Sequence, residues 1–452
     1  MGKLDRSNIS KYRQKLLEAI DRELQQLRSQ SLDVAAAVYL AKEEPPEALI
    51  RSWEIVVKVG DRPRIKLSEK VSIIKVCNRL QGKFLILGNS GSGKTTTLLE
   101  LARCLLIRAN KNPKEPIPIL FNLAAMNTNY PHLASRLINR LQQQYKIPIK
   151  IGNYWLENQH LLPLLDGFDE VISDRKEECL REINGLVENF QPKHLVVCSS
   201  LSAYKKCATK LKLNAAVILQ PLTQNKIKEY TFGHRSRELW YNIAEEPDLL
   251  KLAEVPLFLS MMTLAYEEIL IESWRRIVSR EERKRYVLNA YVRRQLGRET
   301  GDRFYPKNKQ PLPEETKGWL SWLAARMEEK QEREFKINKL DEGWLITTEE
   351  KKIYGWGVKV LSQVIFALIF GSIFGFMWGA IAVFIGIILG WFFAFPGVKK
   401  LMLRVALCSS GNMPWNYRRF LDYAAEKLLL QKVGDRYQFI HKILQQHFRR
   451  QN

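Results

Sequence analysis

Hydrophobic and polar residues follow two patterns along the chain. Five short apolar runs are separated by stretches that carry the three- to four-residue spacing of amphipathic helices. These runs begin at Phe84, Ile117, Leu161, His194 and Ala215. Strands and helices that alternate in this way form a parallel sheet with helices on both faces. The pattern therefore predicts a doubly wound α/β domain over residues 79–222.

Helical periodicity dominates on either side of this domain. Apolar positions within residues 1–78 share one helical face, which predicts packing against the chain's own core or, alternatively, a partner helix. That face comprises Ile9, Tyr12, Leu16, Ile20, Leu24 and Leu27. From Thr223 to about Trp344 the pattern predicts amphipathic helices without further strands. We therefore expect an N-terminal helical region (1–78) and a second helical domain (223–350).

A third pattern is one long run without charge. Val360 to Val398 comprises thirty-nine residues with no formal charge. One helix of this length would span about 58 Å, whereas two passes of about 18 residues match a hydrocarbon core of about 30 Å. We therefore expect a transmembrane helical hairpin over 357–397, with its turn near 376–380. A hairpin buried in a soluble core is the alternative.

Charge adds an orientation to this hairpin. Basic residues stand on both sides of the run, and basic flanks tend to remain cytoplasmic. They are Lys351, Lys352 and Lys359 before it, and Lys399, Lys400 and Arg404 after it. The expected localisation is a membrane with both termini in the cytoplasm. The lipid bilayer is then an expected partner.

The whole chain is strongly basic. It carries 71 Lys and Arg against 48 Asp and Glu, a formal net charge of +23. Such an excess favours polyanions, either nucleic acid or an anionic membrane face. The densest basic stretch, Arg275 to Arg298, is more typical of a solvated helix face. Nucleic acid thus stays open as a partner without being favoured. The six cysteines are scattered, which indicates neither a zinc site nor a disulfide framework.

One motif carries phosphate chemistry. After the strand-like run Phe84 to Leu87, the chain reads G-x-x-x-x-G-K-[ST] and enters a helical pattern. Such a loop turns backbone N–H groups toward phosphate oxygens at a helix N-terminus. The candidate nucleotide-binding residues are Gly88, Asn89, Ser90, Gly91, Ser92, Gly93, Lys94, Thr95 and Thr96. Lys94 is expected to reach the terminal phosphates of ATP or ADP, and Thr95 to bind Mg²⁺.

An acidic cluster supplies the second half of this site. The run LLPLLDGFDE ends its strand at Asp166, which is placed to share Mg²⁺ with Thr95 at the carboxyl edge of the sheet. Asp169 and Glu170 are candidate catalytic residues that could orient or deprotonate an attacking water.

Several stretches together resemble the NACHT family, a branch of the signal-transduction ATPases called STAND proteins. The phosphate loop and LLPLLDGFDE match its motifs, and LQPLTQNKIKEY resembles its linker into the helical domain. EVPLFLSMMTLAY is similar to the motif whose proline, here Pro256, packs near the adenine. The tail 398–452 resembles a winged-helix domain, where His441 falls on the histidine that touches the β-phosphate of ADP.

This resemblance implies a nucleotide switch. It would bind ADP in a closed state and ATP–Mg²⁺ in an open state that assembles into homo-oligomers, in bacterial stress or defence signalling. Relatives end the fourth strand with an arginine where this chain has Ser200, so hydrolysis is expected to be weak unless Lys205 or Lys206 takes the place of that arginine. The resemblance does not disclose the trigger, the stoichiometry or the preference for ATP over GTP. A membrane-anchored transporter or protease subunit and a winged-helix nucleic-acid regulator are the alternatives.

Overall fold

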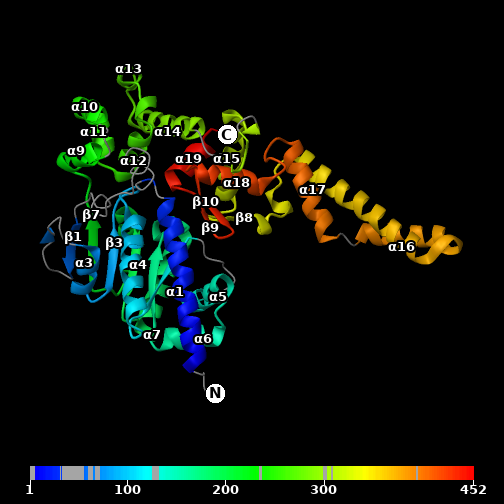
Figure 1. The fold of residues 1–452 in the computed structure, drawn as a ribbon, viewed down its shortest axis with the longest axis horizontal. Coiled ribbons are helices and arrows are strands. Elements are labelled where there is room, and N and C mark those ends of the chain that lie inside the picture. Colours follow the sequence, from blue (N-terminus) through cyan, green and yellow to red (C-terminus); the bar gives the residue numbers. More distant parts are fainter. Residues whose placement is uncertain are drawn as a thin grey trace. The chain divides into compact units, whose positions relative to one another are not determined.

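The structure of the protein is a computed structural model of the 452-residue chain (Figure 1). It describes residues 6–30, 32, 55–59, 65–66, 72–124, 132–233, 237–298, 303–306, 309–392 and 395–451. The chain divides into two compact units, Met1–Gln295 and Leu296–Asn452. Each unit has a β-sheet of its own.

A seven-stranded sheet in the order β2-β1-β7-β3-β6-β5-β4 forms the centre of the first unit. Five of its strands run parallel, and they are the five apolar runs that the sequence predicted. These strands are β3 (Lys83–Leu87), β4 (Ile117–Asn122), β5 (Leu161–Asp166), β6 (Leu195–Ser199) and β7 (Ala215–Leu219). The order brings the carboxyl ends of β3, β6 and β5 side by side, which is where open parallel sheets bind ligands.

Two further strands extend the sheet beyond β7, and the sequence did not predict them. β1 (Ile55–Val59) pairs antiparallel with β7 and also with β2 (Ile65–Lys66). A run as short as β1 has no helix-length periodicity to identify it. Because β1 covers the edge of β7, that edge of the parallel sheet is not left open.

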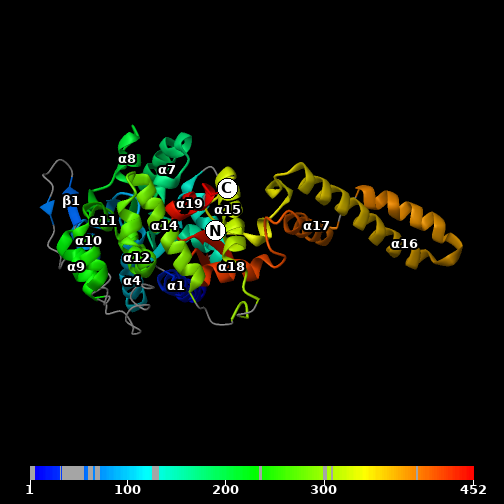
Figure 2. The ribbon, with the colours of Figure 1, turned by 90° about the horizontal axis from the view of Figure 1, so that it is seen from above.

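Helices cover both faces of this sheet. α1 and α4 lie on one side and α7 and α8 on the other (Figures 1 and 2). The helices around the sheet are α1 (Arg6–Ser29), α3 (Ile73–Arg79), α4 (Lys94–Lys111), α5 (Leu133–Tyr145), α6 (Ile149–Glu157), α7 (Lys176–Phe190) and α8 (Leu201–Lys206). The short 3₁₀ turns η2 (Phe168–Glu170) and η3 (Ser173–Arg175) connect β5 to α7. The doubly wound α/β architecture is therefore confirmed.

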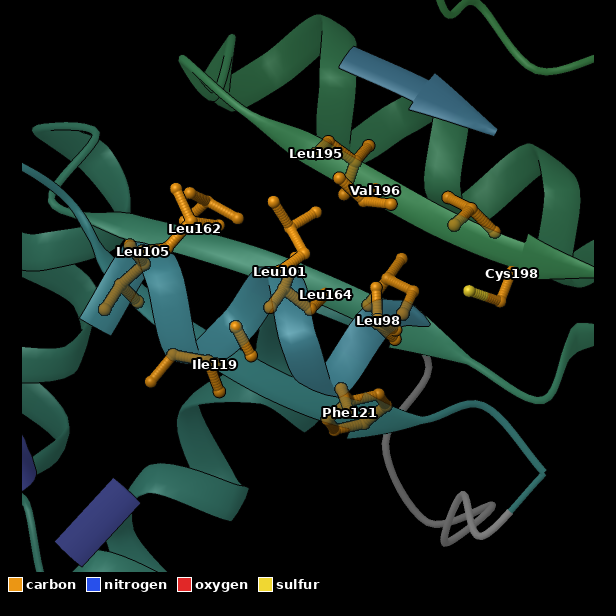
Figure 3. Packing of buried hydrophobic residues seen from close by; sticks show 14 of the residues in the cluster. Leu98, Leu101, Leu105, Ile119, Phe121, Leu162, Leu164, Leu195, Val196 and Cys198 are labelled. Atoms are coloured by element: carbon orange, nitrogen blue, oxygen red, sulfur yellow. The ribbon is translucent and has the colours of Figure 1, made fainter. Parts of the chain in front are cut away.

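The core lies between the strands and α4. Leu98, Leu101 and Leu105 recur along one face of α4 and meet residues of β4 and β5, including Ile119 and Leu164 (Figure 3). All five side chains are buried. Fixing this face of α4 on the sheet also fixes the position of its first residues, which belong to the phosphate loop.

The N-terminal helix α1 packs on α4 and belongs to the same core. Leu16, Ile20 and Leu24 are buried there, so the expectation of packing against the chain's own core is confirmed. The buried Glu23 on the same helix accepts a hydrogen bond from Gln144 at 3.0 Å and another from the Tyr145 hydroxyl. These contacts tie α1 to α5.

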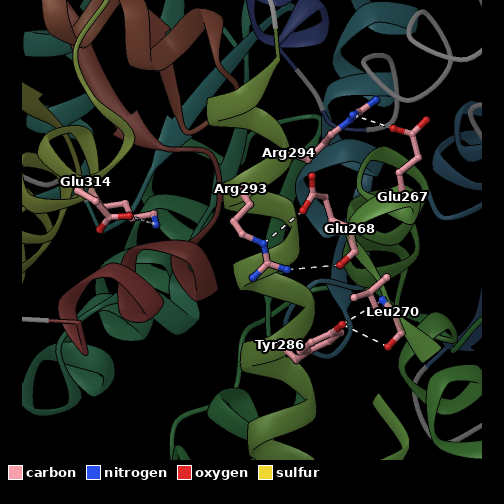
Figure 4. A network of polar contacts seen from close by, with 8 residues as sticks. Glu267, Glu268, Leu270, Tyr286, Arg293, Arg294 and Glu314 are labelled. Carbon is pink, nitrogen blue, oxygen red and sulfur yellow. Dashed lines mark hydrogen bonds and ion pairs between the residues drawn. The ribbon is translucent and has the colours of Figure 1, made fainter. Parts of the chain in front are cut away.

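A set of helices follows the sheet. They are α9 (Gln224–Gly233), α10 (Arg237–Glu245), α11 (Pro247–Ala253), α12 (Pro256–Leu264), η4 (Tyr266–Glu268), α13 (Ile271–Arg275) and α14 (Arg280–Gly297). The basic stretch lies on α13 and α14. Arg293 pairs with Glu268 at 3.3 Å and Arg294 with Glu267 at 2.8 Å (Figure 4). Arg283 pairs with Asp248. Much of the positive charge of this stretch is therefore balanced within the first unit.

The second unit contains a three-stranded antiparallel sheet in the order β8-β10-β9. Its elements are α15 (Pro313–Glu329), β8 (Phe335–Lys336), η6 (Ile337–Lys339), η7 (Glu342–Trp344), α16 (Thr348–Phe392), α17 (Pro396–Ser409), α18 (Tyr417–Glu426), β9 (Leu430–Val433), β10 (Arg436–Phe439) and α19 (Lys442–Arg449). The expectation of no strand between Thr223 and Trp344 is wrong at β8, because two residues are too few to show alternation. β8 joins the same sheet as the C-terminal strands β9 and β10.

The helical range α16 folds back on itself. Rings of Phe366 and Phe395 stack with centroids 4.7 Å apart, although a straight helix would carry the chain about 40 Å over that interval. A Cβ on Gly357 would lie 2.2 Å from the Met402 sulfur, which places α17 directly against the start of α16. Figure 2 shows α16 and α17 side by side. Within the described chain, Thr348–Ile369 is the one helix long and apolar enough to cross a membrane, with a mean hydropathy of 1.3.

Candidate functional site

The candidate phosphate-binding loop connects β3 to α4. Gly91 and Gly93 have φ of +79° and +89°, a left-handed region that side chains disfavour. At Gly88 a Cβ would lie 2.3 Å from the Ser92 hydroxyl oxygen. Glycine is thus required at Gly88 because Ser92 fills the space above it. Asn89 and Ser90 are exposed at the tip of the loop.

Two side chains of the loop have unusual surroundings. The Lys94 ammonium donates to the carbonyl oxygens of Gly88 and Asn89, each at 3.1 Å, so the lysine folds back over the loop. The Ser92 hydroxyl oxygen is buried and makes no hydrogen bond to a described residue. Buried polar atoms normally have a partner, and an anion in the loop would provide one. The loop therefore fits a phosphate group.

Thr95 and Asp166 meet at the edge of the sheet, as the sequence predicted. The Thr95 hydroxyl donates to Asp166 Oδ2 at 2.7 Å, and the Gly167 amide donates to Asp166 Oδ1 at 2.8 Å. Burial raises the pKa of Asp166, while these two hydrogen bonds and the nearby Lys94 oppose the rise. A hydroxyl and a carboxylate are oxygen ligands of the kind that Mg²⁺ prefers. The pair fits Mg²⁺ carried by a nucleotide.

The acidic residues after Asp166 lie on the turn η2. Asp169 Oδ1 accepts a hydrogen bond from the Ser200 amide at 3.0 Å, which ties η2 to the end of β6. The Ser200 hydroxyl in turn caps α8 by accepting from the Ala203 amide at 3.1 Å. No feature of the sequence pointed to the link between Asp169 and Ser200. The catalytic roles of Asp169 and Glu170 stay predictions.

The motif around Pro256 reaches the phosphate loop. Pro256 is buried at the first position of α12. The next residue, Leu257, donates its amide hydrogen to the Gly91 carbonyl at 3.1 Å. A Cβ on Gly91 would lie 3.0 Å from both Leu257 Cβ and Val255 Cγ1. Val255 and Leu257 are therefore contact residues that the sequence did not single out, since apolar residues beside a proline carry no chemical signature.

His441 lies in the second unit, at the N-terminus of α19. Its Nδ1 accepts a hydrogen bond from the Ile443 amide at 3.1 Å, which fixes the imidazole as the helix cap. The predicted contact of His441 with a nucleotide stays a prediction, as does that of Thr96.

A parallel sheet of this strand order, a glycine loop leading into a helix and a facing threonine–aspartate pair together define a P-loop NTPase. A comparison with family models refines this class: residues 83–238 match the NACHT domain. This segment of the chain is a NACHT domain.

Other comparisons add little. No curated protein matches the chain. Among solved structures, CDC6P from Pyrobaculum aerophilum is 10% identical, covers 84% of this chain and 92% of its own, and has a TM-score of 0.29. Drosophila ORC bound to DNA is 13% identical, covers 83% and 84%, and has a TM-score of 0.30.

Proposed function

We propose that the protein is a membrane-tethered nucleotide switch, closed with ADP and open and oligomeric with ATP–Mg²⁺. The observation that carries the nucleotide half of the proposal is the hydrogen bond of 2.7 Å between Thr95 and Asp166, at the base of a loop whose Lys94 folds back over it. Such a constellation binds a metal-bound polyphosphate.

The site residues have separate tasks in this proposal. A magnesium nucleotide supplies the transferable phosphoryl group and the cation that offsets its charge. Lys94 leaves the Gly88 and Asn89 carbonyls and donates to phosphate oxygens instead. Thr95 and Asp166 hold the metal, and Asp169 or Glu170 orients a water. With Ser200 where relatives carry arginine, we expect hydrolysis to be slow.

The contact between the loop and α12 supports a switch. Leu257 donates to Gly91 within the loop itself, so any change of loop conformation also displaces the start of α12. In the closed state, Pro256 packs beside the adenine and His441 contacts the β-phosphate. A nucleotide can bias this equilibrium only by its different affinities for the two states. The γ-phosphate is the group that distinguishes them.

The membrane half of the proposal is supported by the exposed face of α16. Trp356, Val360, Val364 and Leu368 recur every fourth residue, with exposed fractions of 68%, 50%, 48% and 67%. Large apolar side chains in such a row are costly in water and favourable in lipid. The C-terminal helices and the β9–β10 strands, proposed as a winged helix, would join this tether to the switch. Because many α14 arginines are ion-paired, we favour the tether over a nucleic-acid regulator.

A matched pair of substitutions tests the switch. Lys94→Ala removes the phosphate ligand, whereas Lys111→Ala removes an exposed lysine at the other end of the same helix. We expect Lys94→Ala to weaken ADP and ATP binding by about 10- to 100-fold, as for the loss of charged hydrogen bonds, and to abolish the ATP-dependent increase in oligomer size. Lys111→Ala should change neither. Unchanged affinity and oligomer size for Lys94→Ala would refute the proposal.

A further inference from the structure

The hairpin formed by α16 and α17 has a definite register. Its two contacts, Gly357 with Met402 and Phe366 with Phe395, are both centred on about residue 380. In an antiparallel hairpin, residues at equal sequence distance from this centre lie side by side. Lys359 therefore lies level with Lys400, close to the contact of Gly357 with Met402.

Along α16, the leg from Lys359 to residue 380 measures about 30 Å, which equals the hydrocarbon thickness of a bilayer. The charge-free run is thus bounded by Lys359 on one leg and by Lys399 on the other.

Basic side chains gather at the open end of the hairpin and define what we call the basic belt. All are exposed: Lys351, Lys352, Lys359, Lys399, Lys400 and Arg404. Within the described part of the chain, Lys351, Lys352, Lys399 and Lys400 form no ion pair. This distinguishes them from the arginines of α14, which are largely paired. These four lysines therefore present positive charge that no described acidic side chain pairs with.

An aromatic side chain marks the same level. Trp356 is exposed one turn before Lys359, and the apolar row that starts at Trp356 continues toward the tip of the hairpin. Tryptophan and lysine together are typical of the boundary between hydrocarbon and headgroups. A free nucleic acid offers no hydrocarbon to cover Val360 and Leu368, whereas a lipid leaflet offers hydrocarbon and phosphate on one continuous surface.

We propose that the basic belt binds the phosphate headgroups of anionic lipids in the leaflet from which the hairpin enters the bilayer. This inference rests on the membrane tether of the proposed function and adds a preference for lipid class. Each lysine near an anionic surface contributes about a fivefold change in affinity, so three lysines at the boundary contribute about a hundredfold preference.

Full-length protein in non-ionic detergent, mixed with preformed vesicles and floated after detergent removal, tests this preference. One set of vesicles is phosphatidylcholine, and the other contains one part of phosphatidylglycerol to three of phosphatidylcholine. The variant Lys359→Gln/Lys399→Gln/Lys400→Gln is compared with Lys111→Gln/Lys150→Gln/Lys193→Gln, three exposed lysines of the first unit. We expect the first variant to lose most of the hundredfold preference for anionic vesicles and the second to keep it.

Salt and competitors supply independent readouts. At about 1 M salt the Debye length falls to about 3 Å, and the wild-type preference should disappear. Equal flotation of wild-type and belt variant on anionic vesicles would overturn the inference, as would displacement of the protein by inorganic phosphate or by duplex DNA at matched phosphate concentration. If wild-type protein inserts equally into both vesicles, only the lipid preference fails. If it inserts into neither, the tether itself is refuted, while nucleotide binding remains measurable by titration.

Discussion

Gly91→Ala perturbs the contact between the phosphate loop and α12 directly. The new methyl group would sit on a residue with φ of +79°, which costs about 1–2 kcal/mol for an L-amino acid. It would also lie 3.0 Å from Leu257 Cβ and Val255 Cγ1, closer than ordinary van der Waals contact. Overpacking of this kind costs about 1–3 kcal/mol. We therefore expect a destabilisation of about 2–5 kcal/mol.

Thermal unfolding of the nucleotide-free chain measures this cost. About 2–4 °C per kcal/mol is typical for 150–250 residues, and the first unit, with 295 residues, falls at the low end of about 2 °C per kcal/mol, so its transition should fall by about 4–10 °C. Nucleotide affinity should fall as well, because the methyl group pushes the phosphate-binding loop away from α12 and so displaces the amides that bind phosphate. Gly185→Ala is the control: this glycine lies in α7, a Cβ added there would meet no other atom within 4 Å, and alanine should stabilise by about 0.5–1 kcal/mol. A Gly91→Ala protein as stable as Gly185→Ala would show that Gly91 is neither strained nor tightly packed against α12.

Four further single substitutions and one double variant test the site and the fold. Thr95→Val and Asp166→Asn should each remove the Mg²⁺ dependence of nucleotide affinity, a loss of about tenfold or more in titrations with and without the metal; retained dependence would exclude the pair as metal ligands. Burial raises the pKa of the Cys77 thiol from 9.0 to about 11. The unfolded chain therefore releases this proton at lower pH than the folded chain, and the free energy of unfolding falls by about 2–3 kcal/mol as the pH rises from 9 to 11. Cys77→Val should flatten the slope of denaturation free energy between pH 9 and 11, and an unchanged slope would contradict the assignment. Arg136, which is buried, donates to both carboxylate oxygens of the half-buried Glu182 at 2.9 and 3.0 Å. Arg136→Met should therefore destabilise by about 2–4 kcal/mol in denaturant titrations, and Arg136→Met/Glu182→Leu by far less.

The parallel sheet and the phosphate site were predictable because each depends on a local pattern. The five core strands are continuous apolar runs, and the glycine spacing from Gly88 to Gly93 specifies a loop conformation. Asp166 is the last residue of its strand, so its carboxylate lies at the carboxyl edge of the sheet. The distance to Thr95 confirms that reasoning.

Contacts between distant segments were not predictable in the same way. The partners of Arg283, Arg293 and Arg294 lie some 25–35 residues away, and no periodicity links them. The pairing of β1 with β7 and the link from Asp169 to Ser200 depend on how the chain folds back. β8 was not predicted because a strand of two residues is too short to show alternating hydrophobic and polar positions. The contact of α12 with the loop was suggested only by resemblance, since a proline before an apolar helix is common at any helix start.

Isothermal titration of the purified full-length chain with ADP and ATP, in the presence and absence of Mg²⁺, decides whether the phosphate loop and the Thr95–Asp166 pair bind a magnesium nucleotide. We expect saturable one-site binding of both nucleotides, with ATP affinity that falls sharply when the metal is removed. Absence of binding by any purine nucleotide in the presence of Mg²⁺ would contradict this expectation.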